Sequence, residues 1–343
     1  MNVPFDFVDA KLRGRRRKLY EGDRLEEVAH SRNVGELAET IFPEEPPETP
    51  KRLQKRLDQQ ALHEMVQFLP YLDEAHSYLL RTLLSRYQVW NLKIALRLFG
   101  RETAAEQADR FMLDLPPSLA LPREKLLNAS DVDEFLRAVP QETLRESTAP
   151  ALKTYEETNR RAFLEMGLDR GWWQCVEEAL NRLYYWKGQR CLPALEAERR
   201  CRGVLTVLRA ARTYNVNWST LAPLMPALPG ADDEEDAFRR LHEEPDAQTV
   251  ADVLARISNL SIQPDEAQHL PELEDTLWTH VVKTANQQFY TALQSPGTLV
   301  AYTYLKRAEC RKLVSLAEML WRDVPPDKRV ERLQPLTFRR GGG

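Results

Sequence analysis

Residues 79–98 read LLRTLLSRYQVWNLKIALRL, a stretch in which Leu79, Leu83, Tyr87, Trp90, Ile94 and Leu98 recur at steps of three and four. Because an α-helix turns once in 3.6 residues, such spacing predicts a helix with one apolar face. Similar patterns occur in residues 172–184 and 273–292, and no segment sustains the alternation of a half-buried strand. Glycine is scarce and Leu, Ala, Glu and Arg are abundant, which favours helices. The sequence therefore predicts an all-α protein.

The opening stretch belongs to an internal repeat. We take Asn91, Gly203 and Lys312 as equivalent positions, which follow one another at nearly equal intervals along the chain. Apolar residues stand two residues before and one, five and eight residues after each of them: Val89, Cys201 and Cys310; Leu92, Val204 and Leu313; Leu96, Leu208 and Ala317; Phe99, Ala211 and Leu320. Six residues after the equivalent position, the first two copies have Arg97 and Arg209, whereas the third copy has Glu318. Any three buried helices can be aligned on such a stripe, but the near-equal spacing favours three similar multi-helix modules.

Proline-rich breaks suggest where these modules divide. They are Pro43–Pro50, Leu115–Pro122 and Pro223–Gly230, and proline both lacks a donor and restricts its predecessor. The acidic run Asp232–Asp236 follows the last break and is interpreted as a solvated linker. We therefore expect helical modules at 1–115, 116–230 and 231–343.

Charge and cysteine content exclude several classes of protein. The chain has 48 basic and 52 acidic residues and a net charge of −4, whereas a nucleic-acid partner requires a basic footprint. The cysteines are widely spaced and are expected to be reduced core residues: Cys175, Cys191, Cys201 and Cys310. Met1–Asp9 resembles no signal peptide, and no run of about 18 apolar residues predicts a membrane span. Any membrane contact is therefore expected to be indirect, from the cytoplasmic side and through a partner.

Signatures of catalysis are missing, so no catalytic residue, cofactor or metal site is predicted. No phosphate-binding loop, dinucleotide fingerprint or nucleophile elbow occurs. The nearest metal motif begins at His63-Glu64, but Gln67 stands where a zincin helix needs its second histidine. The seven tryptophans, including the Trp172-Trp173 pair, are assigned to packing.

A cluster of six cations lies near the start of the chain: Lys11, Arg13, Arg15, Arg16, Arg17 and Lys18. Three interpretations compete, namely a solvated helix face, attraction to lipid headgroups, and contact with an acidic protein surface. Arg13 and Arg16 are accordingly kept as candidate partner-binding residues.

The repeated motif resembles that of the C-type subunit of bacterial and archaeal V/A-type ATPases, a relative of the d-type subunit of the vacuolar proton pump. That family carries three copies of a helical motif written roughly Glu-x-x-x-x-Asn-Leu-x-x-x-Leu-Arg. The first copy, Trp90–Arg97, retains Asn, Leu, Leu and Arg; the second, Glu198–Arg209, has Gly203 at the Asn place; the third, Tyr304–Leu313, has Lys312 there. Phe5–Leu19 and Val324–Leu333 resemble the family's first and last helices, so the resemblance covers nearly the whole chain.

The resemblance implies a pseudo-threefold funnel of three modules. It also implies a non-catalytic, peripheral subunit that joins the central shaft, a coiled-coil subunit with a small companion, to the membrane rotor ring during H⁺ or Na⁺ transport. Asn91, Arg97 and Arg209 are then candidates for the inner wall, although a structural hydrogen-bonding role for Asn91 is an equal alternative. A helical interaction scaffold unrelated to rotary ATPases is the alternative function, and a metalloenzyme built around His63 and Glu64 is a weaker one.

Overall fold

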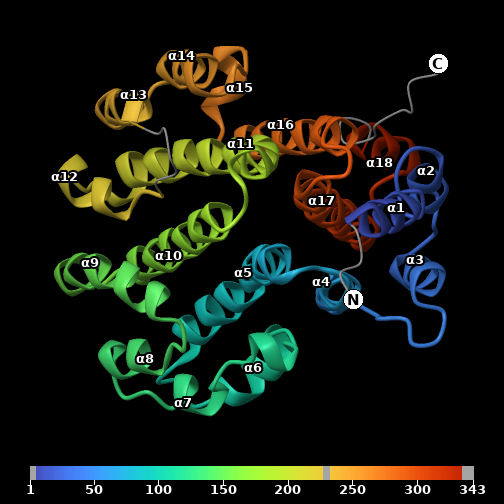
Figure 1. The fold of residues 1–343 in the computed structure, drawn as a ribbon, viewed down its shortest axis with the longest axis horizontal. Helices are drawn as coiled ribbons and strands as arrows, with labels where there is room; N and C mark the ends of the chain where they lie inside the picture. The colour runs from blue at the N-terminus through green and yellow to red at the C-terminus, as the bar shows by residue number, and fades with distance from the viewer. Residues whose placement is uncertain (1–4, 227–231, 334–343) are drawn as a thin grey trace. The chain divides into compact units, whose positions relative to one another are not determined.

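The computed structural model describes residues 5–226 and 232–333, and within these ranges the chain is helical and contains no β-strand (Figure 1). This confirms the all-α class. The predicted break at Pro223–Gly230 lies partly outside the described residues. Those at 43–50 and 115–122 are confirmed as irregular segments, the first running into a helix at Pro50 and the second containing a short 3₁₀ turn.

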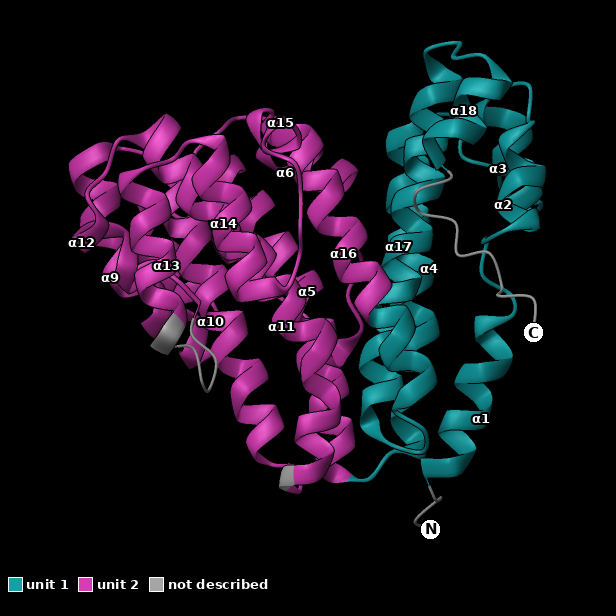
Figure 2. Cartoon of the chain, turned by 90° about the horizontal axis from the view of Figure 1, so that it is seen from above, with its two compact units in different colours: residues 1–73, 285–343 teal, residues 74–284 magenta. Residues whose placement is uncertain are grey.

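The chain divides into two compact units, residues 1–73 with 285–343 and residues 74–284 (Figure 2). Unit 1 contains α1 (Phe5–Arg16), α2 (Asp23–Ala29), α3 (Val34–Ile41), α4 (Pro50–Val66), η1 (Leu69–Tyr71), α17 (Pro296–Trp321) and α18 (Pro326–Leu333). Unit 2 contains α5 (Glu74–Leu98), α6 (Ala104–Phe111), η2 (Pro117–Leu119), α7 (Arg123–Leu127), α8 (Val132–Ala138), α9 (Glu142–Thr158), α10 (Arg161–Asn181), α11 (Tyr185–Arg209), η3 (Ala210–Tyr214), α12 (Trp218–Leu221), η4 (Ala222–Leu224), α13 (Asp232–Glu243), α14 (Ala247–Ser258) and α15 (Pro264–Gln268). Helix α16 (Leu270–Thr291) begins in unit 2 and ends in unit 1. The three-module division stays a prediction.

Local sequence sets several helix boundaries. The side chain of Asn33 accepts a hydrogen bond from the backbone N–H of Glu36 and begins α3, and Asp131 does the same for α8 through Glu134. These caps satisfy donors that the first helical turn leaves unpaired. Asn159 and Asn259 end α9 and α14 with φ values of 52° and 48°. Asparagine tolerates this left-handed conformation better than most residues.

Helix α17 is the centre of unit 1. It lies beside α4 and also contacts α1, α3 and α18 (Figure 2). Its buried Leu313, Leu316 and Leu320 pack with Leu53 and Leu57 of α4 in one apolar cluster. Because both ends of the chain contribute to this cluster, unit 1 is completed only when they meet.

Two glycines bring α9 and α10 of unit 2 unusually close together. A Cβ at Gly167 would lie 2.8 Å from the Cα of Thr148, and a Cβ at Gly171 would lie 2.9 Å from the Cα of Leu144. Small residues four apart let helix backbones approach in this way. The helices lie side by side in Figure 1, and α10 also packs against α5.

Two local predictions are wrong. Residues 232–236 begin helix α13, and Glu234 is buried, so the acidic run is not a solvated linker. The packing assignment of the tryptophans holds for the buried pair Trp172 and Trp173. It fails for Trp90, Trp186 and Trp321, which are 48%, 53% and 61% exposed.

The four cysteines lie within the described residues, form no disulfide, and are buried except for the half-buried Cys175. Burial raises the pKa of the Cys175 thiol to about 11, so it is protonated at neutral pH. In the part of the chain that the structure describes, no helix joins enough length with enough apolar character to span a bilayer.

Candidate functional site

The three copies of the motif lie on the helices α5, α11 and α17, which are 25, 25 and 26 residues long. Eleven of the twelve apolar residues predicted to share the repeated stripe are buried, and Ala211 is half-buried. The equivalent positions Asn91, Gly203 and Lys312 are also buried. These helices therefore supply the repeated framework on which the candidate site is built.

Each equivalent position packs differently. The amide nitrogen of Asn91 donates to the carbonyl oxygen of Leu113 at 2.8 Å, and its oxygen accepts from the Leu113 N–H at 2.9 Å. At Gly203, an added Cβ would lie 2.6 Å from the ring of Phe238 on α13. The Asn91 geometry is the structural role that the sequence left open. The Phe238 ring occupies the space that an asparagine side chain would need at Gly203.

Lys312 is fully buried beside Arg16, Glu21 and Glu309. Burial lowers the pKa of its ammonium to about 8, even though the Glu21 carboxylate opposes that shift. A cation in this place is costly, since burial disfavours the charged form. The third copy therefore differs from the first in charge as well as in shape.

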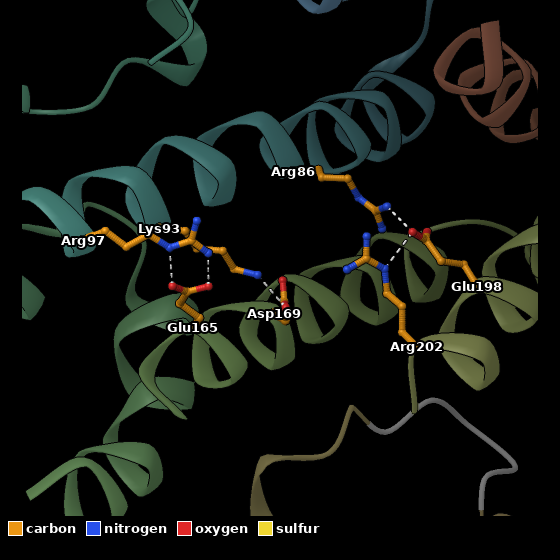
Figure 3. Close-up of polar contacts among 7 residues, drawn as sticks. All are labelled: Arg86, Lys93, Arg97, Glu165, Asp169, Glu198 and Arg202. Carbon is orange, nitrogen blue, oxygen red and sulfur yellow. Dashed lines mark hydrogen bonds and ion pairs between the residues drawn. The ribbon is translucent and has the colours of Figure 1, made fainter. Parts of the chain in front are cut away.

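Arg97 and Arg209 form the same ion pair in two consecutive repeats. The Nε and Nη2 atoms of Arg97 donate to the two carboxylate oxygens of Glu165 at 2.6 and 2.5 Å (Figure 3), and Nη2 of Arg209 donates to Glu274 at 2.8 Å. Glu165 stands as far before Gly203 in the sequence as Glu274 stands before Lys312. The pairing with Glu165 raises the pKa of Arg97. Both arginines thus join a motif helix to the helix that leads into the next copy.

The backbone register repeats with the ion pair. The Cys201 thiol of α11 donates to the Leu277 carbonyl of α16, and the Cys310 thiol of α17 donates to the Leu57 carbonyl of α4, both at 3.7 Å. Leu277 precedes the third equivalent position by nearly the same interval as Leu57 precedes the first. Motif helices α5 and α11 therefore pack antiparallel against the leading helices α10 and α16 of the next copy, and α17 packs against α4 of the first.

We call each packing contact between a motif helix and the leading helix of another copy a joint. The joint between α17 and α4 lacks the repeated ion pair. Glu318 occupies the arginine place and Leu53 occupies the place of the acid. In their stead Glu64 contacts Lys306 at 3.1 Å and accepts a hydrogen bond from the Tyr302 hydroxyl, while Lys306 contacts Glu309 at 2.6 Å. Burial alone would raise the pKa of Glu64, but Lys306, Tyr302 and Arg15 outweigh it and lower that pKa.

This network accounts for Glu64 without a metal. Its carboxylate is held by Lys306, Tyr302 and Arg15. Across residues 5–226 and 232–333, no group of three or more His, Cys, Asp or Glu side chains is arranged to hold a metal ion.

Further ion pairs in unit 2 link α5 to α11 through Arg86 and Glu198 and link α5 to α10 through Lys93 and Asp169. Glu198 accepts from Arg86 and from Arg202, the latter at 2.9 Å, and Lys93 contacts Asp169 at 2.6 Å (Figure 3). Arg86 and Glu198 each stand five residues before the equivalent position of their own copy. One repeat therefore contacts the next through the same place in both.

The basic N-terminal cluster largely binds the protein's own residues. Arg13 pairs with Asp9 at 2.8 Å, and Arg15 lies 3.3 Å from Glu64. Arg16 pairs with Glu21 and donates to Asn286 at 3.0 Å. Lys11 lies 4.4 Å from the ring centroid of Tyr71. Sequence reasoning missed the pairs with Glu64 and Glu21 because those acids lie outside α1, whereas Asp9 lies on α1 four residues before Arg13 and could have been found from helical spacing.

Of the predicted partner-binding residues, Arg97 and Arg209 lie near the surface, with 59% and 46% of their side chains exposed. Asn91 and Arg16 are largely enclosed, and Arg13 is about one-third exposed. The structure brings Arg97 and Arg209 into equivalent joints and places Arg13 and Arg16 together on α1.

Comparison with known proteins adds one finding. A family model described as ATP synthase (C/AC39) subunit matches residues 8–332. Curated proteins yield no match.

Proposed function

The chain belongs to the ATP synthase (C/AC39) subunit family, and on that premise we propose that it is a non-catalytic central-stalk subunit of a rotary V/A-type ATPase. In this role it associates with the other subunits and passes torque between the rotating shaft and the membrane rotor ring, coupling ATP turnover to H⁺ or Na⁺ transport. The proposed location is peripheral, on the cytoplasmic side of the membrane. The match spans every described helix from α2 to α17 and most of α1 and α18, which supports a role for the whole chain.

The observation that carries the coupling role is the repeated joint. Arg97–Glu165 and Arg209–Glu274 join successive copies at equivalent positions, and the Cys201 and Cys310 contacts keep the same register. A torque adaptor must resist shear between its parts, and closely packed helices transmit strain well. Ion pairs that fix the register of neighbouring helices support that demand.

We also propose that the three copies surround a pseudo-threefold axis as a funnel. The support is the cyclic order of the joints, since copy 1 packs on copy 2, copy 2 on copy 3, and copy 3 on α4 of copy 1. Such an order is what a closed ring of three equivalent modules requires.

Arg97 and Arg209 are the proposed shaft-binding residues of the inner wall. Each keeps exposed guanidinium surface while one side is held by a carboxylate, so it is oriented before a partner arrives. Asn91, Arg13 and Arg16 satisfy most of their bonds within the chain, and we propose that they support the wall indirectly.

Charge exchange tests this assignment. Arg97→Glu with Arg209→Glu is expected to weaken binding to the purified shaft subunits about tenfold or more. Each substitution replaces a positive charge at the proposed interface with a negative one and breaks the ion pair with Glu165 or Glu274. In the exchanged variant, Glu165→Arg and Glu274→Arg are added, which rebuilds both internal pairs with reversed charge.

The exchanged variant should recover thermal stability but not shaft affinity. If the arginines serve only the joints, the exchange restores both properties. Unchanged affinity in the first variant would reject the assignment.

The wider proposal of a central-stalk subunit is tested by purifying the tagged chain from native membranes. Mass spectrometry should identify shaft and ring subunits that are recovered with it.

A further inference from the structure

The segment from residue 182 to residue 190, here called the Trp186 turn, joins α10 to α11 and includes the first residues of α11, and it exposes large aromatic side chains. Tyr184 is 75% exposed and Trp186 is 53% exposed. The ammonium of Lys187 lies 5.8 Å from the Tyr184 ring and 5.6 Å from the Trp186 ring, and Arg190 lies 5.4 Å from the Trp186 ring. The rings remain exposed despite these contacts. The protein therefore leaves an unusual amount of aromatic surface in water at this place.

The Trp186 turn is also locally basic in an acidic protein. Between Glu178 and Glu196 the chain contains Arg182, Lys187 and Arg190 and no acidic residue, although its net charge is −4. Polar Asn181 and Gln189 flank the aromatic pair and are exposed. The turn therefore combines aromatic rings with cations and contains no acidic residue of its own.

The equivalent turn of the third copy shows related exposure. Leu293 stands as far before Lys312 in the sequence as Tyr184 stands before Gly203. Leu293 is 54% exposed and the neighbouring Tyr290 is 56% exposed, and no charged residue occurs from position 284 to position 305. A large side chain is thus exposed at the same place in two copies, Tyr184 and Leu293, although Trp186 corresponds to the buried Ser295.

We infer that the Trp186 turn contacts the surface of an anionic lipid bilayer directly. Tryptophan and tyrosine favour the membrane–water boundary, where an apolar ring and a polar edge are both accommodated. Adjacent lysine and arginine side chains attract anionic headgroups. The three cations of the turn complement such a surface, and its two exposed rings lie two residues apart in the same short segment. This contact goes beyond the proposed function, in which the membrane is reached through the rotor ring.

Vesicle binding by the full-length chain tests the inference. The probes are vesicles of phosphatidylcholine alone and of equal parts phosphatidylcholine and phosphatidylglycerol, separated by sedimentation. The chain is expected to bind the anionic vesicles and to be released at about 1 M salt, where charges are screened beyond about 3 Å. Lys187→Gln with Arg190→Gln should weaken binding roughly 25-fold, about fivefold for each cation lost. Tyr184→Ala with Trp186→Ala should weaken it as well.

Matched controls are Trp321→Ala, which removes another exposed tryptophan, and Lys328→Gln, which removes another exposed cation. Both should bind as the unaltered chain does, and circular dichroism should show that every variant is folded. Equal binding to both vesicle types, or anionic binding that survives both double substitutions, would overturn the inference. An absence of vesicle binding would also overturn the inference. This includes the case in which the Trp186 turn binds only detergent-solubilised rotor ring, because the turn would then contact protein.

Discussion

At the scale of single residues, the candidate site is a set of side chains whose partners lie far along the chain. The sequence identified Arg97 and Arg209 as equivalent, but it could not supply Glu165 and Glu274, because an acid on a helix surface looks the same whether or not an arginine meets it. The equal offset of each acid from the next equivalent position was a usable signal. It becomes informative only once the packing of the helices is known.

Asn91 offers the clearest test of a structural role. Asn91→Ala should lower the free energy of unfolding by about 2–4 kcal/mol, because the buried N–H and C=O of Leu113 both lose their partner. Urea denaturation measures this change, and Asn181→Ala, at an exposed position on α10, is the control. A cost below about 0.5 kcal/mol would contradict the structural role, since surface substitutions fall in that range.

Lys312 predicts a pH dependence of stability. Its pKa is about 8 in the folded chain against an ordinary value of 10.5, so the unfolded chain binds more protons between these values. Above about pH 10.5 the lysine is neutral in both states and does not lower the free energy of unfolding. As pH falls through about 8 it becomes charged in the folded chain as well, and the full cost of burying that charge then lowers the free energy of unfolding. Lys312→Met should raise the free energy of unfolding at pH 7 by up to about 3 kcal/mol.

The same variant should flatten the rise in stability from pH 8 to pH 10. Lys328→Met, at an exposed position, should leave that rise intact. Chemical denaturation over this pH range decides the matter, and an unaltered pH profile in Lys312→Met would show that the lysine is charged throughout.

At the scale of helices, the periodicity of apolar residues predicted where the helices lie better than it predicted which face of each helix is buried. The face predicted for α5 included Tyr87, Trp90 and Ile94, which are half-buried or exposed, whereas Leu80, Leu84 and Ala95 are buried. A helix that contacts α6, α7 and α10 buries more than one stripe, so a single apolar face cannot be selected from spacing. By contrast, the residues predicted to share one face along α16 and directly after it are all buried: Leu273, Leu277, Val281, Ala285, Phe289 and Ala292.

Helices α11 and α13 depend on the absence of a side chain at Gly203. Gly203→Ala should lower the free energy of unfolding by about 1–3 kcal/mol, because the new methyl group would overlap the Phe238 ring. Adding Phe238→Leu should recover part of that loss by making room. Calorimetry of both single variants and the double variant gives the coupling between the sites, and additive effects would argue against the contact.

At the scale of the whole molecule, the resemblance predicted the family over nearly the whole chain, and residues 8–332 match it. The division into two units was not predicted. Composition and proline breaks mark where the chain turns, whereas unit 1 is formed by segments from both ends of the sequence. Long-range packing of this kind leaves no local trace in a single sequence.

The two units predict how fragments behave. A fragment of residues 74–291 should fold cooperatively, because it keeps unit 2 together with all of α16. A fragment of residues 1–73 should lack stable structure, because its apolar residues pack on Leu313, Leu316 and Leu320 of α17. Adding residues 292–343 should restore helicity, as measured by circular dichroism. Stable helical structure in residues 1–73 alone would contradict this account.

The contact between Arg86 and Glu198 shows what an ion pair between two equivalent positions requires. Two identical copies would bring the same side chain against itself at this place, and like charges so close repel. A pair of opposite charges therefore needs the copies to have become different. Where equivalent positions of two similar segments face each other, attraction between charges is possible only after their sequences have diverged.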